Sequence, residues 1–295
     1  GASAAGARVL VTMKHVGVNV CADPLFTAAY TGVNGGLVIL AADDPGMFSS
    51  QNEQDSRYYA MASMVPIMEP ADSAEAHRFA KDAYDISEQF DTPVMMRSTV
   101  RISHTKTPVE VGERTEVAKR PYKKDCAKWV MMPAFAKPRR KVLVERISKI
   151  REWVETCPYN IIERNTPEGS NKRIGIICAG AVYQHVKEAC PDADIFKLGV
   201  SWPLPAKALN EFANSVDELH VVEEASTYLS DAVKATGVIL DSFQMPLPAD
   251  GEIHPADILR SLGRKLPQHR DNENDIPNRP PALCPGCPHR VIFKE

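Results

Sequence analysis

The sequence lacks a long apolar run, a strong excess of either charge and a complete glycine-rich phosphate motif. Its longest apolar stretch, around residues 36–42, is far shorter than the roughly 18 residues that cross a bilayer, so it indicates no membrane role. The formal net charge of −3 argues against a nucleic-acid binder that works by neutralising phosphates. The single glycine of "CAGAVYQ" does not make the Gly-x-Gly-x-x-Gly pattern of a dinucleotide site.

The beginning of the chain has neither an initiator methionine nor a charged and apolar signal segment. Small residues, "GASAAGA", run directly into the apolar stretch 9–13. At the other end, Cys284-Pro-Gly-Cys287 lies only a few residues from the last one. We therefore expect that the chain is truncated at both ends.

The cysteines are seven in number, an odd count, and most of them are scattered. Without a signal segment they fit a reducing cytosol better than a disulfide framework, which predicts a cytoplasmic protein. Cys178, inside the apolar run "RIGIICAG", is predicted to be a small buried residue. Cys284 and Cys287 place two thiolates on one tight turn, which suits zinc, an iron–sulfur cluster or a redox dithiol, and one pair is half a metal site.

The pattern of apolar residues predicts an α/β protein with two open, mainly parallel sheets. The runs 9–13 and 36–42 are continuously apolar, as in strands covered on both faces, and a helix pattern over 72–90, capped by Asp72 and Glu75, leads to a third strand. The C-terminal half repeats strand and helix from 173 to a last predicted strand, "GVILDSF". We expect domains at 1–107 and 171–266, an irregular connection with a linking helix at 108–170, and a linker with the start of another domain at 267–295.

Candidate site residues follow the predicted strands, because ligands of open parallel sheets bind at the carboxyl ends of the strands. Lys14, His15 and Asn19 come after the first strand and could line a pocket for a polar cofactor, although a turn with a solvated lysine and a capping histidine explains them equally well. The polar segment 49–57 after the second strand favours an interface or pocket over a plain turn whose Ser50 or Asn52 caps a helix.

Other polar clusters favour structural roles. Glu223 and Glu224 end a predicted strand and would point to opposite faces, which favours a structural or subunit contact over a catalytic pair. The paired aspartates Asp43 and Asp44 resemble a metal-binding edge, but no further ligand completes it. The basic run 137–141 is predicted to be the exposed lead-in to a helix over 141–156.

The stretches "VLVTMKHVGVNVCADPLFTAAYTGVNGGLVILAADDPGMFSSQNEQDSR" and "RPPALCPGCPHR" resemble the large-subunit family of indolepyruvate ferredoxin oxidoreductases, which are thiamine-diphosphate enzymes of the 2-oxoacid:ferredoxin oxidoreductase superfamily. The resemblance covers essentially the whole chain. It implies that 1–107 is the later part of a pyrimidine-binding thiamine domain, that 171–266 is a transketolase-C-terminal-like domain, and that the tail begins a diphosphate-binding domain.

The resemblance implies oxidative decarboxylation of an aryl 2-oxoacid such as indolepyruvate to an acyl-CoA and CO₂. The implied cofactors are thiamine diphosphate, Mg²⁺ and [4Fe–4S] clusters. The implied partners are a beta (small) subunit, ferredoxin and coenzyme A. Lys14, His15 and Asn19 would line the thiamine or substrate pocket, segment 49–57 would contact a neighbouring domain, and Cys284 with Cys287 would supply half of a cluster site.

The family's activating glutamate, its Gly-Asp-Gly metal-binding segment and its cysteine-rich repeats are not found in these residues. We therefore expect the isolated chain to be inactive and to bind thiamine diphosphate weakly. The alternative function is a non-catalytic α/β binding or assembly subunit of a 2-oxoacid oxidoreductase complex. A zinc-turn protein of another family fits less well, because the resemblance is long.

Overall fold

The computed structural model describes residues 1–114, 116–118, 120–267 and 290. Its N-terminal part, 1–158, contains β1 (Val9–Lys14), α1 (His15–Val20), α2 (Ala22–Thr31), β2 (Leu37–Ala42), α3 (Ser56–Ser63), β3 (Ile67–Met68), α4 (Ser73–Phe90), β4 (Val94–Ser98), α5 (Val100–His104), α6 (Cys126–Trp129) and α7 (Pro133–Val154). The C-terminal part, from 159, contains β5 (Ile161–Glu163), β6 (Ile174–Ala179), α8 (Val182–Ala189), β7 (Asp194–Leu198), β8 (Val200–Trp202), α9 (Ala206–Ala213), β9 (Glu218–Val222), α10 (Tyr228–Lys234) and α11 (Pro255–Ser261).

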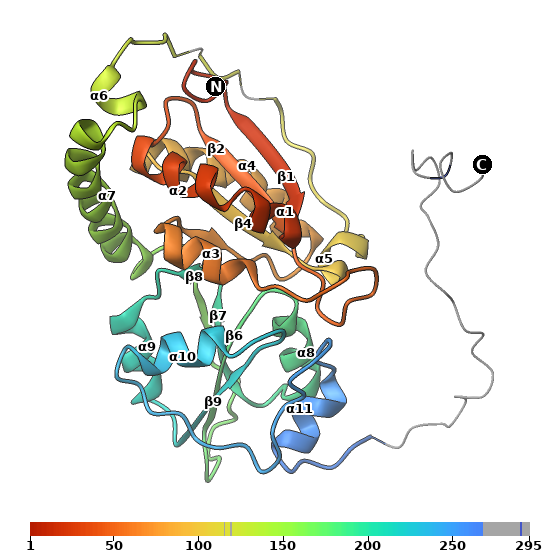
Figure 1. Ribbon diagram of the computed structural model, residues 1–295. Coiled ribbons are helices and arrows are strands. Elements are labelled where there is room, and N and C mark those ends of the chain that lie inside the picture. Colours follow the sequence, from red (N-terminus) through yellow and green to blue (C-terminus); the bar gives the residue numbers. More distant parts are fainter. Residues whose placement is uncertain (115, 119, 268–289, 291–295) are drawn as a thin grey trace.

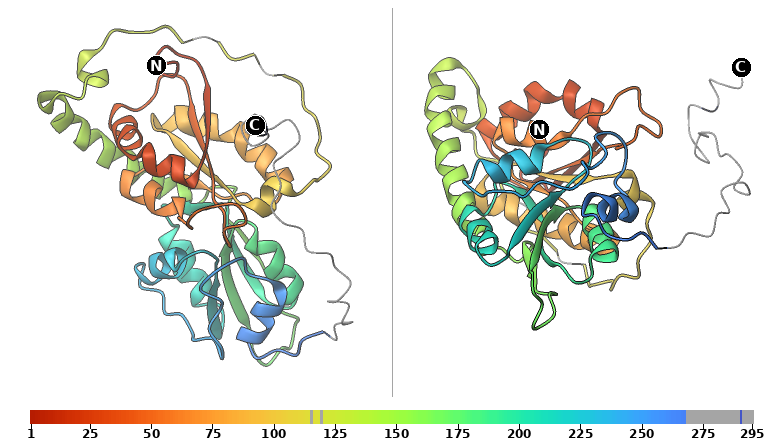
Figure 2. Two further views of the ribbon diagram at one scale, coloured as in Figure 1. Left: turned by 45° about the vertical axis from the view of Figure 1, so that its right-hand side comes forward. Right: turned by 90° about the horizontal axis from the view of Figure 1, so that it is seen from below.

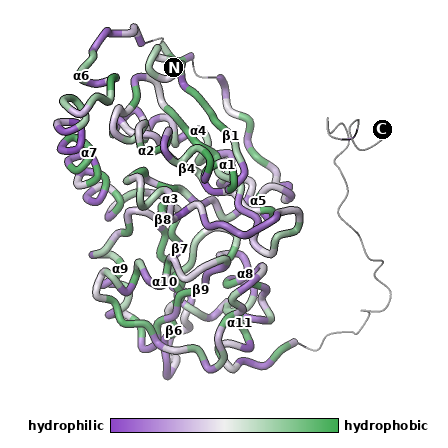
Figure 3. The backbone as a smooth tube through the Cα atoms, viewed as in Figure 1, coloured by the Kyte–Doolittle hydropathy of each residue, from purple (hydrophilic) through white to green (hydrophobic). Residues whose placement is uncertain are grey.

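The first sheet has the order β1-β2-β4-β3-β8, and all its pairs are parallel except β3 with β8. Helices α1, α2 and α3 lie on one face and α4 on the other, as the views of Figures 1 and 2 show. Burial on both faces explains the continuous apolar sequences of β2 and β4. In Figure 3, β1 is largely green, whereas the outer helix α7 alternates between purple and green.

The second sheet has the order β5-β7-β6-β9, in which only β5 pairs antiparallel. Alternate side chains of β6 enter different apolar clusters: Ile177 packs toward the core shared with the N-terminal part, and Ile176 and Cys178 pack toward α8 and α11. The prediction that Cys178 is a buried strand residue is confirmed. The predicted class, α/β with two mainly parallel sheets, is likewise confirmed.

Several local predictions can be compared with the structure. The helix predicted over 72–90 is α4, and its caps are correct: the Asp72 side chain accepts from the Glu75 amide at 2.8 Å, and Glu75 Oε2 accepts from the Ala71 amide at 3.0 Å. The strand predicted at 237–243 is wrong, because this segment has no strand partner and several of its residues are exposed.

The predicted start of the linking helix, at residue 141, is also wrong. The helix begins at Pro133 and contains Pro138, so the basic run 137–141 lies inside the helix and not ahead of it. A proline at the first helical position is favourable because the missing N–H would have no partner there. Arg139 turns inward from this run and donates to the carbonyls of Tyr30 and Thr31 at the end of α2.

The two parts of the chain are joined by shared structure. Strand β8 belongs to the C-terminal part but completes the first sheet, and the amide of Glu69 donates to the carbonyl of Gly199 at 2.9 Å. One apolar cluster extends from Val38 and Met95 of the first sheet to Phe212 and Leu229 of the C-terminal part. The parts are therefore packed as neighbours through an apolar core as well as through charged groups.

A buried arginine bridges the two parts. Arg57, 2 % exposed, forms a bidentate pair with Asp55, with Nε–Oδ1 and Nη2–Oδ2 distances of 2.9 and 2.7 Å. From the C-terminal part, the carbonyl of Glu224 accepts from Arg57 at 3.1 Å, and the Glu223 carboxylate lies 3.6 Å from the guanidinium. We call Asp55, Arg57, Glu223 and the Glu224 carbonyl the Arg57 bridge.

The C-terminal part also encloses the Arg57 bridge. The Ser226 hydroxyl donates to Asp55, and the ring of Tyr228 lies 4.9 Å from the guanidinium of Arg57. Burial alone would raise the pKa of Asp55, but the charges of Arg57 and Arg97 hold it well below its usual range. Asp55 is therefore ionised throughout the physiological pH range.

A second buried arginine, Arg97 of β4, neutralises carboxylates within the N-terminal part. It donates to Asp43 at 2.6 Å and to Glu69 at 2.8 Å, and it is 4 % exposed. Glu224 approaches this group from the C-terminal part and is 6 % exposed. The interface thus carries several desolvated carboxylates that depend on arginines for compensation.

Replacement of Arg57 tests the bridge. Arg57→Met keeps much of the apolar volume but leaves Asp55 and Glu223 desolvated without their partner, so unfolding free energy should fall by about 3–5 kcal/mol. Urea unfolding measures this change. The control Arg114→Met removes an ion pair with Glu116 in which both side chains are exposed, and it should cost less than about 1 kcal/mol. Equal losses in the two variants would contradict a special role for the bridge.

Glu224 should give the stability a distinct pH dependence. Burial raises its pKa, so the folded state holds the proton more tightly than the unfolded state, and this group destabilises the fold as pH rises through its folded pKa. The stability of Glu224→Gln relative to the wild type should therefore increase as pH rises above about 4.5, the ordinary pKa of the carboxyl in the unfolded chain, and should level off once the folded wild type has also lost this proton.

Asp55→Asn should behave in the opposite way, because the Asp55 pKa is depressed. Its stability loss relative to the wild type should shrink as pH falls below about 4, where the unfolded-state carboxyl takes up its proton. Urea titrations of the three proteins across this range provide the measurement, and parallel pH profiles for all three would contradict the assignment.

Candidate functional site

The structure brings Lys14, His15 and Asn19 together at the carboxyl end of the first sheet. Lys14 is the last residue of β1, and His15 begins α1. Asn19 lies four residues after His15 and so shares its helix face. The prediction of a loop here is wrong, because the helix starts immediately after the strand, but the predicted position at the sheet edge is correct.

The loop 43–55 after β2 lies against all three residues. Lys14 Nζ donates to the Ser49 carbonyl at 2.9 Å, His15 Nε2 lies 3.3 Å from Ser50 Oγ, and Asn19 Nδ2 donates to Gln54 Oε1 at 3.2 Å. Parallel pairing of β1 with β2 explains this arrangement, since it places the carboxyl ends of both strands at one edge.

These contacts determine which ring nitrogen of His15 carries the hydrogen. The Ser50 hydroxyl donates its one hydrogen to Asp44, so Ser50 Oγ accepts from His15 Nε2. The protonated ring nitrogen is therefore Nε2, and Nδ1 is left as an acceptor. His15 is 0 % exposed, and neither His15 Nδ1 nor Asp44 Oδ1 has a hydrogen-bond partner among the described residues.

The charge state of His15 follows from its surroundings. Burial lowers the pKa of His15, and the nearby charge of Lys14 lowers it further, whereas Asp43 and Asp44 act in the opposite direction. The ring is therefore neutral at neutral pH. A neutral, buried imidazole with a free acceptor nitrogen can receive a hydrogen bond from a donor group of a ligand.

The polar segment 49–57 serves two different contacts. Asp55 and Arg57 reach the C-terminal part, which confirms a domain contact for this end of the segment, while Ser49 and Ser50 hold the residues after β1. Asp55, and neither Ser50 nor Asn52, caps α3 by accepting from the Arg57 amide at 2.9 Å.

Asp43 and Asp44 have separate partners. Asp43 accepts from the backbone and hydroxyl of Ser56 and from Arg97, and Asp44 accepts from Ser49 and Ser50. In the described part of the chain, no group of three or more His, Cys, Asp or Glu side chains has the arrangement of a metal site. Cys284 and Cys287, predicted as metal ligands, lie outside the described residues.

A cavity of about 330 Å³ adjoins the same edge of the first sheet. Phe48 of the 43–55 loop, Arg101 and His104 of α5, and Glu252 of the C-terminal part line it. Arg101 and Glu252 form an ion pair across it at 2.7 Å. The rule that ligand-binding residues follow parallel strands also applies to α5, which comes directly after β4, and this rule could have identified Arg101 and His104 from the sequence.

Glu223 and Glu224 have the structural role that was predicted. Glu223 accepts from the amides of Leu229 and Ser230 at 2.7 and 2.8 Å and thereby caps α10. A groove of about 510 Å³ begins beside them, at the carboxyl end of β9. Sequence reasoning missed Arg97, although an arginine inside the apolar strand sequence "VMMRS" is itself a sign of a buried charged site.

None of the helices in the described residues is long and apolar enough to span a membrane. The side chains at the carboxyl edge of the first sheet form the main candidate site. They combine a neutral histidine, a serine and an aspartate in one hydrogen-bonded series with a lysine and an asparagine beside it.

Comparison with known proteins gives close relatives along nearly the whole chain. It is 37 % identical over 99 % of its length to the indolepyruvate oxidoreductase subunit IorA of Methanothermobacter marburgensis, and 36 % identical over 99 % to that of Archaeoglobus fulgidus. In both cases the match covers 49 % of the relative, so the chain spans about half the length of the curated relatives it matches.

A solved structure, the 2-oxoglutarate:ferredoxin oxidoreductase from Magnetococcus marinus, shares the fold, with a TM-score of 0.68 over 89 % of this chain and 54 % of that chain. Its sequence identity of 16 % supports the fold alone. The family model for pyruvate flavodoxin/ferredoxin oxidoreductase, thiamine diphosphate-binding, matches residues 1–158, which include the entire candidate site. Because this match covers more than half of the chain, the chain belongs to the pyruvate flavodoxin/ferredoxin oxidoreductase, thiamine diphosphate-binding family.

Proposed function

We propose that this chain is part of an indolepyruvate:ferredoxin oxidoreductase, which oxidatively decarboxylates aryl 2-oxoacids to acyl-CoA and CO₂ and reduces ferredoxin. The observation that carries the proposal is the 35–37 % identity, over 98–99 % of the chain, to relatives named as indolepyruvate oxidoreductase subunits. The subunit name supports a small partner subunit. Coenzyme A and ferredoxin complete the proposed reaction as co-substrate and electron acceptor.

The candidate site suits the aminopyrimidine ring of thiamine diphosphate. The buried acceptors His15 Nδ1 and Asp44 Oδ1 have no partners in the described structure, and an aminopyrimidine has amine hydrogens to donate to such atoms. When bound, thiamine diphosphate supplies the nucleophilic carbon and the electron sink that loss of CO₂ from a 2-oxoacid requires. We assign His15, with Lys14 and Asn19 beside it, to the lining of this cofactor pocket.

The remaining contacts define what each residue does. Asp44 orients Ser50, and Ser50 holds the proton of His15 on Nε2, so that Nδ1 keeps its lone pair toward a ligand. Lys14 and Asn19 hold the backbone and side chain of the 43–55 loop in place. The Arg57 bridge anchors the far end of the same loop on the C-terminal part.

Metal ions and clusters belong to the proposal for the whole protein. The cofactors would include Mg²⁺ for the diphosphate and [4Fe–4S] clusters for transfer of single electrons. Cys284 and Cys287 would contribute half of one cluster site, with further ligands from other segments. The alternative is a non-catalytic assembly subunit, in which case the protein to which the chain belongs would not itself convert a 2-oxoacid.

The proposed activity is tested on the protein as its organism makes it, purified with any accompanying subunit. Reduction of ferredoxin should depend on both coenzyme A and a 2-oxoacid, and kcat/KM should be at least about tenfold higher for indolepyruvate or phenylpyruvate than for pyruvate or 2-oxoglutarate. A preference for the small oxoacids would contradict the proposed substrate class. Cofactor binding without turnover of any oxoacid would favour the assembly subunit.

The role of His15 is tested by thiamine diphosphate binding in titration calorimetry. His15→Gln keeps a donor for Ser50 but loses the acceptor at Nδ1, so the affinity should fall about five- to tenfold. His15→Asn, whose amide oxygen lies near the position of Nδ1, should lose less. His77→Asn changes an exposed histidine of α4 and is the matched control. Wild-type affinity in His15→Gln would remove His15 from the cofactor pocket.

A further inference from the structure

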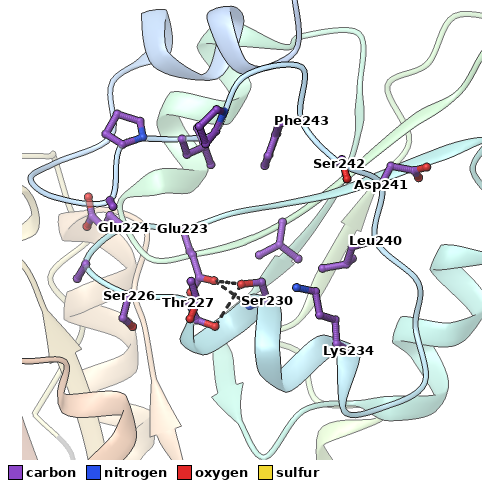
Figure 4. A pocket seen from close by; sticks show the side chains of 16 residues that line it. Glu223, Glu224, Ser226, Thr227, Ser230, Lys234, Leu240, Asp241, Ser242 and Phe243 are labelled. Carbon is purple, nitrogen blue, oxygen red and sulfur yellow. Dashed lines mark hydrogen bonds between the residues drawn. The ribbon is translucent and has the colours of Figure 1, made fainter.

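The groove at the carboxyl end of β9 is separate from the candidate cofactor residues. It has a volume of about 510 Å³, within the usual range for small-molecule sites. Strand β9, helix α10 and the segment 240–249 form its walls. Figure 4 shows its lining side chains, with apolar groups such as Leu240 and Phe243 opposite the polar residues of α10.

Two of the three carboxylates around the groove, those of Glu223 and Asp241, have hydrogen-bond partners. Glu223 is occupied by the first amides of α10, the hydroxyl of Ser230 and Arg57. Asp241 accepts from the Leu219 amide at 2.8 Å, and Figure 4 shows its side chain directed away from Lys234. Glu224 points toward the N-terminal part at the far end of the groove, where Arg97 lies nearby.

Lys234 is the one cationic residue among those that line the groove. Lys234 lies in the last turn of α10, and its ammonium makes no hydrogen bond or ion pair with any residue in the described part of the chain. Figure 4 shows this ammonium on the Ser230 side of the groove. The hydroxyl of Ser242, in the opposite wall, likewise has no partner among the described residues. Both side chains are exposed and are free to contact a ligand, so an anionic group can pair with Lys234 and accept from Ser242.

We propose that this groove binds a small carboxylate with an apolar body, whose carboxylate pairs with Lys234 and whose body packs on Leu240, Phe243 and Pro246. A single negative charge suits the site better than a phosphate dianion, because the neighbouring carboxylates would repel additional charge. The apolar wall favours a ligand with an aliphatic or aromatic group over a fully polar one. This assignment does not depend on the proposed catalytic activity.

The position of the groove connects its occupant to the Arg57 bridge. The turn 223–226 forms one wall of the groove and, on its other side, holds Arg57 and Asp55. Ala225 within this turn has a positive φ of 73°, a backbone conformation that costs energy for an alanine. A ligand in the groove would therefore contact the same turn that holds Arg57 and Asp55 of the N-terminal part. This position suits the groove to an effector.

Titration calorimetry with phenylacetate on the complete protein tests the assignment. Phenylacetate should bind, and acetate, inorganic phosphate and phenethylamine should bind more weakly by about tenfold or more. Lys234→Gln should weaken phenylacetate binding at least about tenfold, through loss of a charge-assisted contact. Lys207→Gln, at an exposed lysine of α9 outside the groove, is the matched control and should bind as the wild type does.

A second variant separates the apolar contact from the charge. Phe243→Ala should weaken phenylacetate more than acetate, with folding checked by circular dichroism because Phe243 also stacks on His220. Phenylacetate binding that persists unchanged in Lys234→Gln would place the ligand at another site and overturn the proposal. Equal or tighter binding of phenethylamine would overturn it as well, because it would show that the carboxylates set the specificity of the groove.

Discussion

The arrangement of this protein depends on the charge pair between Asp55 and Arg57. Both groups are almost completely withdrawn from water, and a desolvated ion pair is stable only when its geometry is good and its remaining hydrogen-bonding groups are satisfied. The N-terminal part supplies the pair itself, and the C-terminal part supplies the carbonyl of Glu224, the carboxylate of Glu223 and the hydroxyl of Ser226. Each part therefore completes a polar group that would be costly to bury without the other.

This constraint reaches the candidate site through one short loop. The loop 43–55 leaves β2 at Asp43, which Arg97 and Ser56 hold, and ends at Asp55 in the Arg57 bridge. Its middle residues contact Lys14, His15 and Asn19. Both ends of the loop are buried and paired, and Ser50 in its middle sets the direction of the His15 acceptor nitrogen. Cofactor-binding residues held by rigid surroundings lose less entropy when a ligand binds.

Much of this fold could be predicted from the sequence, because the strongest signals are local. Doubly buried parallel strands require continuous apolar runs, and α4 has its capping residues in the sequence itself. The remaining differences come from tertiary structure. The apolar run 237–243 resembles a strand, but no neighbouring strand pairs with it, whereas the short β8 becomes a strand only because β3 offers an open edge. Pairing across such distances leaves no periodicity for a local pattern to detect.

The site shows the same division between local and distant causes. That polar residues after β1 and β2 lie together follows from parallel pairing, so Lys14, His15, Asn19 and the following loop could be placed at one edge from sequence. The direction of the His15 proton could not, because it depends on whether Ser50 gives its hydrogen to Asp44. Likewise, the adjacent glutamates at the end of β9 indicate that their side chains point to opposite faces of the sheet. The sequence does not indicate that Glu223 caps a helix or that the carbonyl of Glu224 accepts from Arg57 of the N-terminal part. Sequence order determines which groups reach an edge, and the partners that desolvate them determine their chemistry.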